Sequence, residues 1–235
     1  MTERGAGVQH ELRAVADSVR ASARSFFKTG VGEYGAGDRF LGITVPDQRR
    51  IARRYPDLLW TDLRALLRSP YHEDRFVALV ILTEQFARGD TAERTRIAHR
   101  YVSAIARCVN NWDLVDATAY KILGEYLRTH PKERSVLRKL ARSPNLWERR
   151  VAIVATFASI VHGEFADTFR IADVLLGDTH DLVHKAVGWM LREAGKRDRK
   201  ALEVFLRTRH ARMPRTMLRY AIERFPEARR RRYLR

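Results

Sequence analysis

The chain has 235 residues, of which 45 are Lys or Arg and 28 are Asp or Glu, so its net charge is +17. The single cysteine, Cys108, excludes an intramolecular disulfide framework, and no stretch approaches the roughly 18 apolar residues that a membrane-spanning helix needs. The excess of cations predicts a protein that binds nucleic acid, and the first residues lack the apolar core of a signal peptide. We therefore expect a cytoplasmic, nucleoid-associated protein.

The first distinctive segment is irregular and rich in glycine, and it runs from Gly30 to Pro46. It lacks the Lys-Ser/Thr pair of a phosphate-binding P-loop, so it does not indicate a nucleotide site. Near its end, Thr44 and Pro46 predict the start of a helix whose free N–H groups would hold a phosphate, with Arg49 and Arg50 following. A plain helix cap explains the same residues equally well.

After this segment the chain has the periodicity of helices. Apolar residues recur three and four positions apart, as at Ala78, Leu79, Ile81 and Leu82, and strand patterns are nearly absent. The pattern predicts short helices joined by tight turns, which is an all-α fold.

The helices also repeat. The dipeptide at Ser69, with Pro70 next to it and Arg75 six residues on, recurs 74 residues later at Ser143 with Arg149. Two periods of about 37 residues predict an α-solenoid of HEAT-like repeats, although other antiparallel helical arrays give part of the same pattern. We expect residues 1–228 to form a single HEAT-like repeat domain. Residues 229–235, which include four consecutive arginines, should be a disordered basic tail.

In a solenoid, equivalent positions of successive repeats lie side by side. Asp116, Arg150 and Lys185 align with spacings of 34 and 35 residues, so they should form a row along a concave basic groove. Trp112 lies one helical turn before this row and Trp189 one turn after it.

Asp116 is unexpected on a surface that binds DNA, because a carboxylate repels phosphate. The ordinary interpretation of Trp112 and Asp116 is a core tryptophan beside a surface aspartate. A carboxylate among cations also has a chemical use, because it stabilises a developing positive charge and holds an attacking water. A sugar that loses its base becomes such a cation, an oxocarbenium ion, so the pair indicates cleavage of an N-glycosidic bond.

Further cations follow on the predicted helices. Arg150 is ordinarily a solvated arginine, and its functional interpretation is a clamp on a phosphate or on the nearby carboxylate. Arg149 should have a structural role, since Arg75 is its counterpart in the repeat. Arg192 and Lys196, four residues apart, would form a basic stripe for consecutive phosphates.

Two further features of the last third of the chain bear on its packing and on metals. A glycine inside a helix costs roughly 1 kcal/mol against alanine, so we expect a second helix or a nucleic-acid backbone to lie close to Gly188. His180 and His184 have the spacing of metal ligands on a helix, but no third ligand accompanies them. We expect no metal and no cofactor.

The sequence resembles the AlkD-type DNA glycosylases, which are HEAT-like-repeat enzymes that release alkylated purines from DNA. The resemblance covers essentially the whole chain, and the combination of its motifs is highly specific. The matching segments are Phe40-Leu41-Gly42-Ile43-x2-Pro46-x2-Arg49, Trp112-x3-Asp116, Trp147-x2-Arg150 and Lys185-Ala186-x-Gly188-Trp189-x-Leu191-Arg192-Glu193.

The resemblance implies a role for each matching site residue. Asp116 would be the catalytic carboxylate that stabilises the oxocarbenium sugar and positions water. Trp112 and Trp189 would pack against the deoxyribose and the backbone around the lesion, and Arg150 would assist at the phosphate of the lesion. Tyr34 resembles a family position near the lesion. The residues that we expect to contact DNA are Tyr34, Thr44, Arg49, Lys185, Arg192 and Lys196.

The resemblance also implies a substrate. We expect a monomeric, monofunctional glycosylase that acts on N3- or N7-alkylated purines in double-stranded DNA without flipping the lesion into a pocket. Three alternatives stay open. Some relatives remove bulky natural-product adducts, others bind DNA structures or proteins without catalysis, and a lyase would use Lys185 as a Schiff-base nucleophile.

Overall fold

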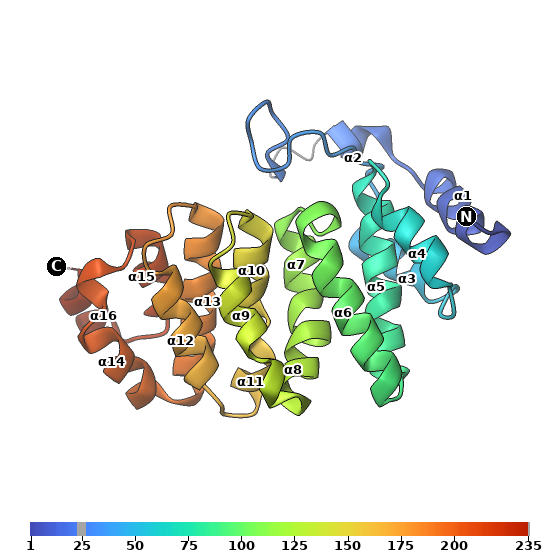
Figure 1. Ribbon diagram of the computed structural model, residues 1–235. Coiled ribbons are helices and arrows are strands. Elements are labelled where there is room, and N and C mark those ends of the chain that lie inside the picture. Colours follow the sequence, from blue (N-terminus) through green and yellow to red (C-terminus); the bar gives the residue numbers. More distant parts are fainter. Residues whose placement is uncertain (23–26, 235) are drawn as a thin grey trace. The chain divides into compact units, whose positions relative to one another are not determined.

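The computed structural model describes residues 1–22 and 27–234, and its regular structure in these ranges is helical (Figure 1). The one exception is an isolated bridge between Arg39 and Tyr71. This confirms the all-α class. The chain divides into two compact units, Met1–Thr118 and Ala119–Arg235, which we call the N-terminal unit and the C-terminal unit. None of the described helices is both long enough and apolar enough to cross a membrane. The single domain over residues 1–228 stays a prediction.

The N-terminal unit is built around one buried helix, α5. The helices α1, α3, α4 and α6 pack against it, and its middle is apolar on every side, with Val77, Ala78, Leu79 and Ile81 fully buried. The helices of this unit are α1 (Glu3–Ala14), α2 (Ser18–Ser22), α3 (Val45–Ala52), α4 (Trp60–Leu67), α5 (His72–Arg88), α6 (Thr91–Cys108) and α7 (Trp112–Ala119), which ends one residue past the unit.

The C-terminal unit is built around α13, against which α10, α11, α12, α14 and α15 pack. It begins with a π-helical turn that continues from α7. Its helices are η2 (Tyr120–Gly124), α8 (Glu125–Thr129), η3 (Pro131–Glu133), α9 (Ser135–Ala141), α10 (Leu146–Val154), α11 (Phe157–Val161), α12 (Ala166–Leu175), α13 (Asp181–Arg197), α14 (Arg199–Arg207), η4 (His210–Arg212), α15 (Arg215–Ala221) and α16 (Glu227–Leu234).

The repeat at Ser69 and Ser143 is a repeat of structure as well as of sequence. At each position the serine lies two residues past the end of a helix, α4 or α9, and its Oγ accepts the N–H of the residue two places on. The Oγ of Ser69 lies 3.1 Å from the nitrogen of Tyr71, and the Oγ of Ser143 lies 3.0 Å from that of Asn145. The turn that starts α5 is therefore built in the same way as the turn that starts α10.

The repeated arginines have the structural role that the sequence predicted. Arg75 and Arg149 each donate from Nη1 to the carbonyl oxygen of the turn serine, over 2.8 and 3.1 Å. Each also binds a buried carboxylate, Arg75 that of Asp38 at 2.7 Å and Arg149 that of Asp178 at 2.6 Å. The two arginines thus hold a turn and a carboxylate in each unit.

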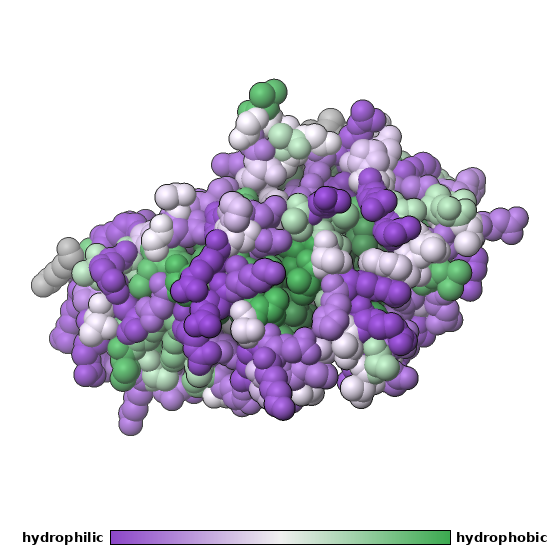
Figure 2. All heavy atoms as spheres, in the orientation of Figure 1, coloured by the Kyte–Doolittle hydropathy of each residue, from purple (hydrophilic) through white to green (hydrophobic). Residues whose placement is uncertain are grey.

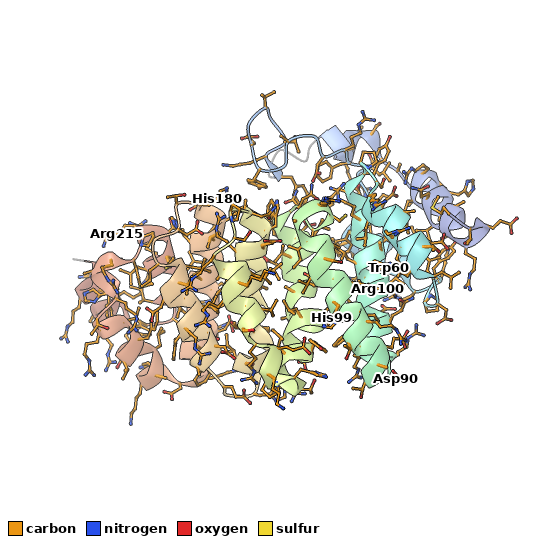
Figure 3. The ribbon with its side chains drawn as sticks, in the orientation of Figure 1. Trp60, Asp90, His99, Arg100, His180 and Arg215 are labelled. Atoms are coloured by element: carbon orange, nitrogen blue, oxygen red, sulfur yellow. The ribbon has the colours of Figure 1, made fainter. Side chains whose placement is uncertain are left out.

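Charged side chains join helices of the N-terminal unit. Arg13 of α1 binds the buried carboxylate of Asp74 on α5 through two hydrogen bonds, of 2.5 and 2.9 Å. Elsewhere in this unit, the guanidinium of Arg100 on α6 lies over the ring of Trp60 on α4, 4.7 Å from its centroid (Figure 3). Hydrophilic residues cover most of the face seen in Figure 2, as the net charge of +17 leads one to expect.

The basic end of the chain is a helix, so the expected disordered tail is wrong for the described residues 229–234. They belong to α16, Glu227–Leu234. Tyr233 on this helix packs edge-on against Phe225, at 5.8 Å between ring centroids, and against His210 at 5.4 Å. These aromatic contacts hold the helix that carries the arginine run, and the charge pattern gave no sign of them.

Gly188 lies where α13 meets α15. A Cβ at this position would lie only 2.4 Å from Cβ of Tyr220 and 2.5 Å from the carbonyl oxygen of Met217, both on α15. The close neighbour expected at this glycine is therefore a second helix.

We expect Gly188→Ala to lower the free energy of unfolding by about 1–3 kcal/mol, because the backbone of α15 must move to admit the methyl group. The control is Gly177→Ala, since a Cβ at Gly177 meets nothing within 4 Å. That variant should stay within about 0.5 kcal/mol of wild type. Urea unfolding measures both changes, and equal stability of the two variants would contradict the packing described for α13 and α15.

Candidate functional site

Trp112 and Asp116 lie on α7 one helical turn apart, as their spacing predicted. The buried Asn111 precedes the helix, and its side-chain oxygen accepts the N–H of Trp112 at 2.8 Å. Both Trp112 and Asp116 are half-buried, so each presents part of its side chain at the surface of the N-terminal unit. A helix start held in this way fixes the direction in which both side chains leave the backbone.

An aromatic cluster supports Trp112 from behind. Its ring stacks on that of Phe27, with 5.7 Å between centroids and 26° between planes. Phe27 in turn stacks on Phe40 at 4.8 Å, and His72 packs 4.9 Å from both of these rings. We call Phe27, Phe40, His72 and Trp112 the aromatic cluster. Because Phe27 and His72 are almost fully buried, the cluster gives Trp112 a rigid backing.

His72 links α5 to two other segments through carboxylates. Its Nε2 lies 2.8 Å from Oδ2 of Asp113, the residue that follows Trp112 on α7. Its Nδ1 faces Oδ2 of Asp38 in the glycine-rich segment, at an ion-pair distance of 3.5 Å. The imidazole therefore lies between two carboxylates, each of which is carried by a different part of the chain.

Asp38 is the buried anion at the centre of this arrangement. It faces His72 and accepts hydrogen bonds from Arg75 at 2.7 Å, from Asn111 at 3.2 Å and from Asn110 at 3.3 Å. Its side chain is only 4% exposed, so these donors replace the water that the carboxylate has lost. The residues just before α7 are thus tied to the start of α5.

The charges of this network shift the pKa values of its members. Burial alone would raise the pKa of Asp38, but the nearby imidazole of His72, the charge of Arg75 and the hydrogen bond from Asn111 outweigh it, so the pKa is lowered. Burial alone would lower the pKa of His72. The charge and hydrogen bond of Asp113, helped by Asp38, outweigh that effect, and the pKa of His72 is raised above its ordinary 6.5.

The end of the glycine-rich segment is held by Glu73, the neighbour of His72. Its fully buried carboxylate accepts the backbone N–H groups of Leu41 at 2.9 Å, Gly42 at 3.0 Å and Ile43 at 3.4 Å. Gly42 has a φ of +78°, and a Cβ there would lie 2.1 Å from the carbonyl oxygen of Asp17. This explains the glycine in the Phe40–Ile43 motif.

The charge of Asp116 acts on the protein interior beneath it. Burial raises the pKa of Tyr101, and the negative charge of Asp116 raises it further. The hydroxyl of Tyr101 is hydrogen-bonded to Oγ1 of Thr118 at 3.0 Å. The hydroxyl of Thr118 in turn donates to the carbonyl oxygen of Leu114 on α7. Tyr101 therefore stays neutral and supports α7 from α6.

The other predicted catalytic residues lie in the C-terminal unit. Arg150 on α10 is 4% exposed, and its Nη1 donates to the carbonyl oxygen of Leu182 in the first turn of α13. It is a buried arginine, not the solvated one that its residue type alone suggests. Trp189 on α13 is half-buried and packs 6.2 Å from the ring of Phe157. The row of Asp116, Arg150 and Lys185 stays a prediction, because its members belong to different units.

The predicted phosphate contacts on α13 are all in ion pairs. Lys185 binds Asp181 one turn earlier, with 2.7 Å between Nζ and Oδ2, and lowers the pKa of that carboxyl. Lys196 binds Glu193 at 2.6 Å. Arg192 binds Glu193 at 3.5 Å and also Glu223, which follows the end of α15. A phosphate would therefore have to compete with carboxylates for Arg192 and Lys196.

The predicted contacts near the N-terminus lie on or beside α3. Thr44 is the N-cap of this helix, because its Oγ1 accepts the N–H of Asp47. The plain helix cap is thus present, and the bound phosphate stays a prediction. Arg49 lies with its guanidinium 5.9 Å from the centroid of Phe76, and Tyr34 is half-buried in the turns of the glycine-rich segment.

The histidine pair is part of the turn that starts α13. Nδ1 of His180 accepts the N–H of Leu182 at 3.1 Å, and Nε2 of His184 binds the carbonyl oxygen of Asp178. Burial lowers the pKa of His180, which keeps this nitrogen available as an acceptor. Among residues 1–22 and 27–234, no three His, Cys, Asp or Glu side chains are grouped so as to hold a metal ion.

The supporting residues Asp38, His72, Glu73 and Asp113 were not predicted from the sequence. One signal was available. The run from His72 to Arg75 places four polar or charged residues directly before the apolar stretch that begins at Phe76. A helix that is apolar on every side is buried along its length, including its first turn. Because buried polar groups need hydrogen bonds or ion pairs, these four side chains must pair with groups elsewhere in the fold.

Both the fold and the sequence of this chain match those of known proteins. The fold is that of a solved structure described as a predicted DNA alkylation repair enzyme from Enterococcus faecalis, with a TM-score of 0.70 over 90% of this chain and 97% of that chain, at 16% identity. The sequence model of the DNA alkylation repair enzyme family matches residues 8–225. The chain belongs to this family, which confirms the resemblance and supports a role in the repair of alkylated DNA. Curated proteins gave no match.

The network around His72 predicts how stability depends on pH. A raised pKa in the folded state means that the contribution of His72 is fully present below pH 6.5 and is lost as the pH rises through the raised value. The lowered pKa of Asp38 means that its contribution is present above pH 3.8 and is lost in stronger acid. Urea unfolding should therefore show the largest difference between wild type and His72→Gln near pH 5–6, and a smaller one near pH 9. A difference that grows with pH would contradict the charged state of His72.

Proposed function

We propose that this protein is a monofunctional DNA glycosylase that hydrolyses the N-glycosidic bond of N3- or N7-alkylated purines in double-stranded DNA. The observation that carries the proposal is the half-buried carboxylate of Asp116, one turn from Trp112, on a helix whose start is anchored by Asn111 and His72. In a chain of net charge +17 that belongs to a DNA alkylation repair family, such a carboxylate weakens phosphate binding and is explained best by chemistry.

The reaction needs little more than this carboxylate and water. The bond between the purine nitrogen and C1′ of the deoxyribose breaks, and its electron pair leaves with the purine. The sugar becomes an oxocarbenium cation, which the negative charge of Asp116 stabilises. A water molecule held by the same carboxylate then adds its oxygen to C1′ and loses a proton. The products are the free base and an abasic site. N3- and N7-alkylated purines carry a positive charge, so they already leave readily.

The remaining site residues would bind the DNA around the lesion. Trp112 and Trp189 would pack against the deoxyribose and the backbone, and Arg150 would hold the lesion phosphate. The DNA contacts would be completed by Tyr34, Thr44, Arg49, Lys185, Arg192 and Lys196. We propose that the protein acts as a monomer in the cytoplasm, needs no metal or cofactor, and binds with an affinity that falls steeply as salt rises. Packing against the sugar without base flipping would also admit bulky adducts.

The geometry of Lys185 favours hydrolysis over the lyase alternative. A Schiff-base nucleophile needs its amine free to attack the sugar carbon, whereas Nζ of Lys185 lies 2.7 Å from Oδ2 of Asp181 in an ion pair. A non-catalytic protein that binds DNA structures is the remaining alternative, and it is separated from the glycosylase by the consequences of changing Asp116.

We expect Asp116→Asn to reduce the single-turnover release of 7-methylguanine from duplex DNA about 100- to 1,000-fold, because a neutral amide does not stabilise the sugar cation. Its affinity for the same duplex should be unchanged or higher, since a negative charge near phosphate has been removed. The matched control is Asp173→Asn, which removes a carboxylate that binds Arg209 on the C-terminal unit and should keep the wild-type rate. If wild type and Asp116→Asn bind DNA alike and neither releases base, the non-catalytic alternative is correct for this substrate.

A further inference from the structure

One side chain in the N-terminal unit contacts both α7, which carries Trp112 and Asp116, and the glycine-rich segment. His72 is 2% exposed and belongs to the first turn of α5. Its ring packs against both Phe27 and Phe40, and its two nitrogens face Asp113 on α7 and Asp38 in the glycine-rich segment. The proposed reaction does not use this imidazole, although the ring is buried and contacts two aromatic rings and two carboxylates.

We propose that His72 is a positioning residue for base excision, which sets the position of Trp112 and the N-terminus of α7 through its bond to Asp113. The proposal rests on the glycosylase function proposed above. His72 does not touch the reacting atoms in this account. It acts through α7, the helix that carries both Trp112 and Asp116.

The geometry gives this bond a direct effect on the site. Asp113 follows Trp112 and precedes Asp116 by three residues, so all three move together as one turn of helix. Trp112 is also held through its ring, which stacks on Phe27, and Phe27 packs on His72. Two routes thus lead from His72 to Trp112, one along the backbone of α7 and one through the aromatic cluster.

Histidine suits this place because it combines a flat ring with two N–H donors. In the protonated form, which the raised pKa favours, Nε2 donates to Asp113 while Nδ1 faces Asp38. Phenylalanine would keep the packing of the ring and lose both polar contacts. Glutamine would place a donor near the position of Nε2 and lose the ring. The two substitutions therefore separate the polar role of His72 from its packing.

The same helix turn offers a matched control. Asp74, two residues from His72, is fully buried and is held by Arg13 at 2.5 and 2.9 Å and by Ser69 at 2.6 Å. These partners belong to α1 and to the turn before α5, so Asp74 has no link to α7 among its described contacts. Asp74→Asn should destabilise the protein without moving Trp112.

The experiment compares His72→Phe, His72→Gln and Asp74→Asn with wild type in three measurements. These are the single-turnover release of 7-methylguanine at saturating enzyme, the affinity for a duplex containing a tetrahydrofuran abasic analogue, and the ¹⁹F spectrum of protein labelled with 5-fluorotryptophan. The chain has four tryptophans, and Trp112→Phe assigns the signal of Trp112. Asp113→Ala replaces His72→Phe if the latter does not fold, since it breaks the same bond from the more exposed side.

We expect His72→Phe to slow base release about 10- to 100-fold, because a displacement of about 1 Å at a site costs that much. Its affinity for the abasic duplex should change less than about threefold, and the ¹⁹F signal of Trp112 should move while the other three stay in place. His72→Gln should recover part of the rate. Asp74→Asn should keep the rate and the signal at a lower urea midpoint.

The outcomes separate this proposal from the proposed function. An unmoved Trp112 signal in His72→Phe or Asp113→Ala overturns the positioning role, whether or not the protein is a glycosylase. A loss of rate in Asp74→Asn equal to that in His72→Phe also overturns it, since the loss would then follow stability alone. If wild type releases no base, the glycosylase proposal fails, and the ¹⁹F spectra still decide the role of His72.

Discussion

The structure around the candidate site depends on one buried arrangement of charges, with His72 between Asp113 and Asp38 and with Arg75 on the far side of Asp38. When His72 is protonated, which its raised pKa favours, two cations face two carboxylates and the charges balance in a region that water hardly reaches. Removing one member would leave its partner buried without compensation, which costs about 3–5 kcal/mol. The start of α5, the glycine-rich segment and the start of α7 are consequently fixed together, and α7 carries Trp112 and Asp116.

The carboxylates of this basic chain fall into two groups. Asp38, Glu73 and Asp74 are buried, and cations or backbone N–H groups satisfy their oxygens, so their charge is used within the fold. Asp116 is half-buried on the surface of α7, where its charge acts on the buried Tyr101 and would act on a ligand bound at this surface. In the glycosylase function that we propose, this outer position has a use, since the sugar of a departing alkylpurine is a cation.

Much of the fold followed from the sequence because its signals are local. Apolar periodicity predicted the helices, the dipeptide repeat predicted a repeated helical unit that the equivalent turns at Ser69 and Ser143 display, and Gly188 predicted a close neighbour, which is α15. The supporting network did not follow, because the partners of His72 lie 34 residues before it and 41 residues after it. Pairings over such distances are set by packing. The helical end of the chain was missed for a similar reason, since Tyr233 finds its partners through the fold and the charge pattern contains no trace of them.

The claim that Asp116 stabilises a sugar cation is tested most directly by binding. One duplex would carry a positively charged pyrrolidine abasic nucleotide, which imitates the cation, and a second would carry the neutral tetrahydrofuran nucleotide. The phosphates of both are the same, so the ratio of the two affinities isolates the effect of the charge at the sugar. Wild type should bind the cationic duplex more tightly, and Asp116→Asn should lose that preference. The same preference in both proteins would contradict the role given to Asp116.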